Sequence, residues 1–262
     1  MGTPLKSPPV YFTVVQARFN TLLKLGDYLA SIQEGMRKAG FPDFTSRKMV
    51  TLQLAAQEVQ VTPPNVVNLE QFLFGNAHKT HMFVLNPDAL TLQSTRYGQF
   101  EDFSAQFLEG LALVDKVVQL DFTDRVGLRY LDHVAPRPND RLDLYVVPEV
   151  RGLGARLGGK TVHAFSETFS HLGDIQLRSR VLIQDGGLAF PPDLAADGMQ
   201  IDDRFLEYSG HHATLDTDGF IERRMPFSAS AVGEQLNAIH GVISAAFKAA
   251  VTEYAFKVWD EV

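Results

Sequence analysis

The segment Arg125-Val-Gly-Leu-Arg-Tyr-Leu-Asp-His-Val134, in the middle of the chain, decides the predicted fold. Its apolar residues Val126, Leu128 and Tyr130 alternate with other residues, which predicts a strand that carries these three side chains on one face. We expect that face to lie in the hydrophobic core.

The residues before this strand predict a mixture of strands and amphipathic helices. Apolar residues recur every three or four positions in two segments, which is typical of helices that bury one face. The predicted helices span residues 22–36 and 100–118, and the predicted strands span residues 10–19, 49–55, 81–85 and 89–97. The proline-rich residues 62–65 are interpreted as a loop. The predicted order is therefore β-α-β-β-β-α-β.

The residues after this strand predict more hairpin strands and one long helix. Residues 136–160 are interpreted as a linker, in which 141–147 form a short strand or a turn and the glycine-rich residues 152–159 form a loop. The predicted strands span residues 162–171, 175–184 and 205–215, and Asp216-Thr-Asp-Gly219 is interpreted as the turn after the last of them. A helix is expected from Ser228, a natural N-cap, to Val258.

Together these elements predict an α+β fold in which amphipathic helices cover one face of a mainly antiparallel sheet. Two similar halves, residues 1–135 and 161–262, are expected to form one compact unit, with the linker between them. A doubly wound nucleotide-binding fold is not predicted, because it requires repeated alternation of strands and helices.

The composition narrows the classes of function. The chain has 262 residues, 45% of them apolar, and its 24 Lys and Arg against 31 Asp and Glu give a net charge of −7. An acidic protein is a poor general binder of polyanions. The absence of cysteine excludes disulfides, thiolate nucleophiles and Cys-ligated metals. With no targeting signal and no apolar run of about 18 residues, we expect a cytoplasmic protein without a membrane contact.

One glycine-rich segment resembles a phosphate-binding loop. Gly154, Gly159, Lys160 and Thr161 match the pattern G-x-x-x-x-G-K-T. A β-rich segment follows them, however, where a phosphate-binding loop requires a helix. A nucleotide-dependent enzyme is therefore an alternative only, and no cofactor is predicted.

A second alternative is a protein that binds or processes nucleic acid. It would use a local basic patch, with His211 or His212 as the acid or base; the patch consists of Arg178, Arg180, Arg223 and Arg224. Cross-strand pairing of the sheet arginines with Glu167, Asp132 or Glu207 is the commoner outcome. Adjacent histidines on a strand point to opposite faces, so no metal site is predicted either.

Three segments resemble a sporadically distributed bacterial family of uncharacterised proteins of about 250–270 residues. The segments are Pro8-Pro9-Val10, Val126-Gly-Leu-Arg-Tyr130 and His240-x-x-Ile243-x-x-x-Phe247 in the last helix. The resemblance implies no activity, cofactor or catalytic residue. A patchy distribution is typical of mobile or defence-related genes. The first strand departs from the family, because Tyr11-Phe12-Thr13 stands where members more often carry an acidic residue.

The first hypothesis is a non-enzymatic accessory protein that binds another protein, as an oligomer or within a bacterial assembly. No catalytic set is predicted, and 19 Phe residues are enough to fill a core and still supply a contact surface. If the last helix is continuous, it carries apolar residues on more than one face. The predicted interface residues are Phe247, Tyr254, Phe256 and Trp259. An equal alternative is that the helix bends and Trp259 packs on the core.

Overall fold

A single antiparallel sheet forms the centre of the fold, in a computed structural model that describes residues 5–53, 65–157, 161–196 and 198–261. Its strand order is β2-β3-β4-β5-β1-β6-β9-β8-β7. The strands are β1 (Val10–Phe19), β2 (Asp43–Gln53), β3 (Asn65–Gly75), β4 (His81–Asn86), β5 (Ala89–Ser94), β6 (Phe122–Val134), β7 (His163–Leu172), β8 (Ile175–Gly186) and β9 (Gly210–Pro226). The predicted α+β class is confirmed.

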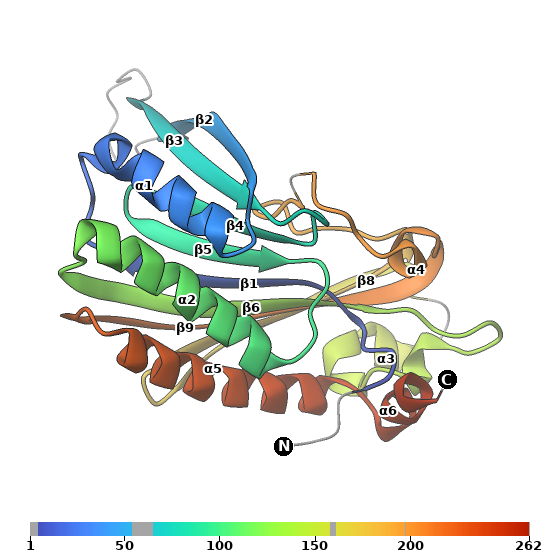
Figure 1. The fold of residues 1–262 in the computed structure, drawn as a ribbon. Helices are drawn as coiled ribbons and strands as arrows, with labels where there is room; N and C mark the ends of the chain where they lie inside the picture. Colours follow the sequence, from blue (N-terminus) through green and yellow to red (C-terminus); the bar gives the residue numbers. More distant parts are fainter. Residues whose placement is uncertain (1–4, 54–64, 158–160, 197, 262) are drawn as a thin grey trace.

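Three long helices cover one face of this sheet (Figure 1). They are α1 (Leu25–Lys38), α2 (Phe100–Val118) and α5 (Ala229–Ala250). Val126, Leu128 and Tyr130 of β6 belong to the core cluster that these helices close, and none is more than 7% exposed. The face predicted from their alternation is therefore confirmed.

The other face of the sheet is partly covered by the connection between β8 and β9. We call this connection the strap (residues 187–196 and 198–209), and it contains the short helix α4 (Asp203–Leu206). A bulge in β1 lets Tyr11 and Phe12 both pack into the cluster under the strap. The Tyr11 hydroxyl also donates a hydrogen bond of 2.6 Å to the carbonyl of Ala189. We call the part of this face that the strap leaves uncovered the open face.

The two halves of the sheet repeat one arrangement. β1 pairs with β5, which is followed by β4 and β3, and β6 pairs with β9, which is followed by β8 and β7. A long helix follows β5 in one half and β9 in the other. β6 therefore begins the second half in the structure, whereas the predicted first half, residues 1–135, includes it.

The first half contains a strand, β3, that was not predicted from the sequence. The predicted strand at 49–55 is β2, which begins at Asp43, and β3 follows it. Residues 54, 55 and 62–64 lie outside the described part of the chain. β3 shows little alternation because Phe72 and Phe74 face the helices while Leu73 packs under the strap.

The last predicted strand of the second half and the turn predicted after it are also wrong. Residues 205–215 are not one strand, since α4 occupies the first of them and β9 begins at Gly210. The predicted turn Asp216-Thr-Asp-Gly219 lies inside β9, which runs on to Pro226. Gly219 is required there because α5 crosses directly above it. A Cβ atom at this position would lie 2.8 Å from Cγ2 of Ile239.

The predicted linker and the predicted last helix differ from the structure as well. The linker region forms two 3-10 helices, η1 (Leu142–Leu144) and η2 (Pro148–Arg151), and the short helix α3 (Gly154–Leu157). The last helix is two helices, because α5 ends at Ala250 and α6 (Glu253–Asp260) begins after Thr252. Thr252 caps α6 by accepting a hydrogen bond from the amide of Ala255.

The close approach of α5 to β9 gives a direct test of the fold. Gly219→Ala places a methyl group against Ile239 and Ile243, and we expect it to destabilise the protein by about 1–3 kcal/mol. Gly241→Ala is the matched control, because this exposed helical position has no heavy atom within 4 Å of the new Cβ. The control should be neutral or stabilising by up to about 1 kcal/mol. Urea unfolding measures both, and equal stabilities for the two variants would contradict the packing of α5 on β9.

Candidate protein interface

The aromatic residues predicted as an interface at the C-terminal end pack mainly against one another. The rings of Phe247 and Trp259 stack with centroids 5.9 Å apart, and Phe256 meets Trp259 edge-on at 5.9 Å. Trp259 is only 6% exposed. This follows from the break at Thr252, which turns α6 back onto the body of the protein. Tyr254 is 39% exposed and donates a hydrogen bond of 2.9 Å to Asp140.

The arginines predicted as one basic patch lie apart. Arg178 pairs in register with Asp218 of β9, and Arg224 follows Asp218 by six residues along the same strand. Six residues of strand span about 20 Å. Arg223 bonds Asp174 at 2.8 Å. The Arg224 guanidinium lies 4.1 Å from the centre of the Phe122 ring. The structure therefore brings Arg178 and Arg180 together, but not these two with Arg223 and Arg224.

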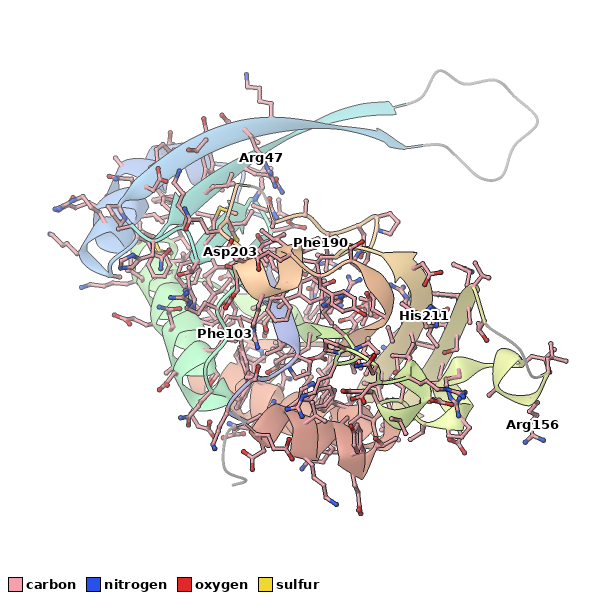
Figure 2. The ribbon with its side chains drawn as sticks, turned by 90° about the vertical axis from the view of Figure 1, so that its right-hand side faces the viewer. Arg47, Phe103, Arg156, Phe190, Asp203 and His211 are labelled. Carbon is pink, nitrogen blue, oxygen red and sulfur yellow. The ribbon has the colours of Figure 1, made fainter. Side chains whose placement is uncertain are left out.

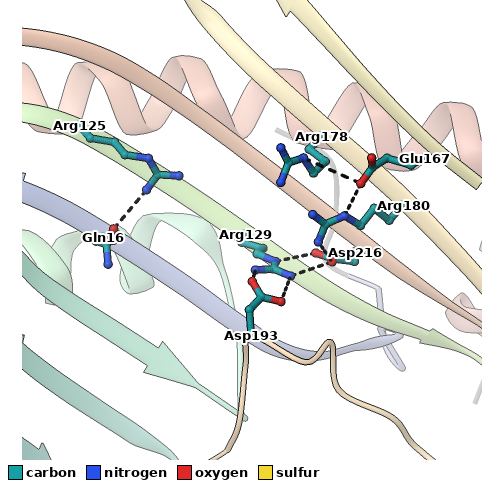
Figure 3. A network of polar contacts seen from close by, with 8 residues as sticks. All are labelled: Gln16, Arg125, Arg129, Glu167, Arg178, Arg180, Asp193 and Asp216. Carbon is teal, nitrogen blue, oxygen red and sulfur yellow. Dashed lines mark hydrogen bonds and ion pairs between the residues drawn. The ribbon is translucent and has the colours of Figure 1, made fainter. Parts of the chain in front are cut away.

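The open face carries a charge network centred on a buried ion pair (Figure 3). Arg129 Nε lies 2.6 Å from Asp216 Oδ1, and Nη2 lies 2.8 Å from Oδ2, which makes a bidentate pair. The two side chains are only 11% and 6% exposed. Arg129 Nη1 also bonds Asp193 of the strap at 2.6 Å. One guanidinium thus ties β6 to β9 and the strap to the sheet.

The network extends across β8 to the edge strand β7. Arg180 bonds Glu167 at 2.6 Å and Asp216 at 3.2 Å (Figure 3). The hydrogen bond from Arg180 holds the pKa of the Glu167 carboxyl below its usual range. The predicted pairing with Glu167 is thus confirmed. Asp132 lies instead on the helix-covered face with Tyr130, and Glu207 ends α4, so neither forms the expected pair.

Polar and acidic groups also surround Arg125, the next arginine along β6 on the open face. Arg125 bonds Gln16 at 3.2 Å, lies 3.7 Å from Glu222 and covers the Phe220 ring at 4.4 Å. Burial raises the pKa of the nearby Asp218 carboxyl, although Arg125 opposes the shift. A face on which arginines alternate with carboxylates offers few free cations to a phosphate backbone.

The predicted phosphate-binding segment is only partly described. Gly154 begins α3, a helix of a single turn, and its α-carbon lies close to the Thr161 side chain. Gly159 and Lys160 lie outside the described residues. The segment that follows Thr161 is the strand β7, as predicted, so no helix N-terminus follows the motif.

The two adjacent histidines point apart, as predicted for a strand. His211 Nδ1 lies 3.0 Å from Asp185 and borders an open cleft of about 890 Å³ beside residues 136–143. His212 is fully buried, and its ring meets that of His133 edge-on at 4.7 Å. Within the described part of the chain, no group of three or more His, Asp or Glu side chains could hold a metal ion.

Exposed apolar side chains gather elsewhere, along η1, η2, α3 and β7. The described residues include eleven exposed large apolar side chains, and seven of them lie between residues 144 and 172. They are Leu144 (43%), Leu153 (69%), Leu157 (72%), Val162 (67%), Phe165 (58%), Phe169 (45%) and Leu172 (48%). We call these seven side chains the 144–172 surface. Figure 2 shows that α3, marked by Arg156, lies at the periphery of the molecule.

Comparison with known proteins adds no further guide to the site. No protein-family model, curated protein or solved structure matches the chain. The bacterial family proposed from sequence therefore remains a prediction. No helix in the described ranges is both long and apolar enough to cross a membrane.

The buried ion pair at the centre of the network predicts unequal effects for its two carboxylates. Asp216→Asn leaves Arg129 buried without its full countercharge, and we expect a loss of about 3–5 kcal/mol in unfolding free energy. Asp193→Asn removes a partner that is 59% exposed, and it should cost less than about 1 kcal/mol. Urea unfolding at neutral pH measures both. A larger loss for Asp193→Asn would mean that the strap contact, and not the β6–β9 contact, is the stronger.

The adjacent residues Asp132 and His133 are buried with opposite pKa shifts. Burial raises the pKa of Asp132 to about 7, and burial together with His212 lowers the pKa of His133 to about 4. The folded state therefore disfavours the ionised form of both residues, so stability falls as the pH rises toward 7 for Asp132 and falls as the pH drops below 6.5 for His133.

Asp132→Asn separates these two effects. The variant should be more stable than the wild type at pH 8, by roughly 2–4 kcal/mol, because it removes a buried carboxylate whose pKa is raised by about three units. The difference should shrink as the pH falls to 4, where Asp132 is neutral, while the His133 contribution is the same in both proteins. Urea unfolding across this range measures it. A variant less stable than the wild type at pH 8 would show that the carboxylate is stabilised by partners.

Proposed function

We propose that this protein is a non-enzymatic binding component that contacts another protein through the 144–172 surface. The observation that supports it most strongly is the concentration of exposed apolar side chains in this one stretch. Large exposed apolar side chains that gather along one edge of a folded protein are typical of contact sites for other molecules.

The members of this surface lie on both sides of the edge strand β7, because Phe165 and Phe169 point to the open face and η2 and α3 lie on the opposite side. The Ser166 hydroxyl of β7 donates a hydrogen bond of 3.0 Å to the carbonyl of Val150 in η2. α3 contacts η2 in turn, so Leu153 and Leu157 come from the segment that η2 holds beside β7. Apolar side chains with arginine at the margin are typical of protein interfaces. Here the marginal arginine is Arg178, whose guanidinium lies 5.3 Å from the centre of the Phe169 ring.

The charges of the open face favour protein binding over nucleic-acid binding. A site for nucleic acid needs cations that are free to replace the counterions of several phosphates. Arg129 and Arg180, by contrast, are each bonded to two carboxylates. These ion pairs do not prevent the binding of a protein partner, because the neighbouring apolar side chains would make the contact.

Site-specific photo-crosslinking in the native host tests this proposal. A benzophenone side chain at Leu157 or Phe165 should capture a protein, because both positions lie within the 144–172 surface. Leu23 is the matched control, since it is apolar and 95% exposed but lies far from this stretch in sequence, just before α1. We expect a crosslinked species of defined mass from positions 157 and 165, at least several times more abundant than from position 23.

Two outcomes would contradict the proposed function. One is equal crosslinking at positions 23, 157 and 165, which would indicate random collision. The other is no protein adduct from position 157 or 165 although the variants accumulate and melt as the wild type does.

A further inference from the structure

β7 is an edge strand with few of the features that usually prevent strands from pairing. It stands last in the strand order and pairs, within the described residues, with β8 alone. Its sequence, His-Ala-Phe-Ser-Glu-Thr-Phe-Ser-His-Leu, contains neither proline nor lysine, and its register with β8 is regular from Leu172 back to His163. Such an edge presents unpaired backbone amides and carbonyls along ten residues.

The sequence of β7 is also nearly symmetric about Glu167. Phe165 and Phe169 stand two residues on either side of it, and His163 and His171 stand four residues on either side. Ser166 matches Thr168, and Ala164 matches Ser170. A two-fold axis in an antiparallel pair brings residues at equal distances from the centre opposite each other, so such a strand matches a second copy of itself.

The side chains that would meet are on the same face. Phe165, Glu167 and Phe169 alternate onto the open face, where Glu167 meets Arg180 and Phe169 meets the guanidinium of Arg178. Phe165 and Phe169 are 58% and 45% exposed in the single chain. Pairing of two such strands covers four of these rings.

We propose that a second copy of this chain pairs antiparallel with β7, on a two-fold axis through Glu167, and joins the two sheets into one. This inference rests on the proposed function and names its partner. In this arrangement each residue of one copy lies opposite a residue of the second copy at the same distance from Glu167. The opposite pairs are Phe165 with Phe169, Ser166 with Thr168, Ala164 with Ser170, and His163 with His171. Aromatic pairs opposite each other in a sheet stabilise the pairing.

The one unfavourable pair is Glu167 with its own equivalent, and the structure supplies the countercharge. Arg180 lies 2.6 Å from Glu167 and Arg178 lies 3.9 Å from it. Two carboxylates at the axis would therefore be surrounded by four guanidinium groups. Like charges opposite each other destabilise a sheet unless they are compensated in this way.

Paired cysteines test the axis and the register together. Because the chain contains no cysteine, His163→Cys and His171→Cys each introduce a single thiol at an exposed position. In the proposed pair, residue 163 of one copy lies opposite residue 171 of the other, at about 4.5–5.5 Å between α-carbons, which suits a disulfide. In a dimer formed by one variant alone, the thiols of the two copies lie about 26 Å apart, because eight residues separate positions 163 and 171 along the strand.

We therefore expect a disulfide-linked dimer when the two variants are mixed and oxidised with copper phenanthroline. It should be at least tenfold more abundant than in either variant alone. The wild type should sediment as a dimer, and Phe165→Lys with Phe169→Lys should sediment as a monomer of unchanged circular dichroism. Leu23→Lys is the control that should leave the dimer intact.

Other results would overturn the inference. A wild type that stays monomeric in concentrated solution, with no disulfide in the mixture, excludes the second copy. Equal linkage in the single variants excludes this register. In either case, crosslinking of a different protein at position 157 or 165 would still support the proposed function, so the failures of the two proposals are distinguishable.

Discussion

The pairing of β1 with β6 is the interaction on which the rest of this structure depends. The two strands are hydrogen-bonded from Val10 to Phe19, at the centre of the sheet, and they join two halves that would otherwise each have an exposed edge there. Val15 and Leu128 lie directly opposite each other on the helix-covered face. α2 and α5 then pack side by side across the junction, so one hydrophobic core serves both halves.

The two ends of this sheet are covered by helices of unequal length, and the proposed contact surface lies at the end with the shorter ones. In the first half, the chain between the central strand and the outer strands forms α1, a helix of 14 residues that contacts β3. In the second half, the corresponding chain forms η1, η2 and α3, none longer than four residues. These short elements cannot bury as much apolar surface as α1 does. Leu153 and Leu157 on these short elements therefore remain exposed.

Sequence periodicity predicted the elements that have one buried face and one polar face. The alternation in β6 and the helical spacing in α2 are of this kind, and both match the structure. β3 was missed because it is apolar on both faces near Phe74. Asp216 and Gly219 have the composition of a turn, yet Asp216 is an ion-pair partner of Arg129, and Gly219 makes room for α5. These roles depend on residues that are distant in the sequence, so the local composition did not indicate them.

The candidate surface was harder to predict than the fold. The C-terminal aromatic residues suggested an interface because a continuous helix would carry apolar side chains on more than one face, whereas the break at Thr252 turns Trp259 back onto the core. The exposure of the β7 aromatic residues was not predicted, since Phe165 and Phe169 alternate in the way that the buried face of any strand does. Their exposure follows from the position of β7 at the end of the strand order, which depends on the whole topology.

Hydrogen–deuterium exchange of β7 in dilute and in concentrated solution tests the central claim most directly. Unpaired edge amides exchange rapidly, and pairing with a second strand slows them. The proposed pairing predicts that amides of residues 163–172 exchange more slowly as the protein concentration rises, while the β4–β5 hairpin, inside the sheet, does not change. Exchange of residues 163–172 that is independent of concentration would contradict the claim that β7 binds a second copy.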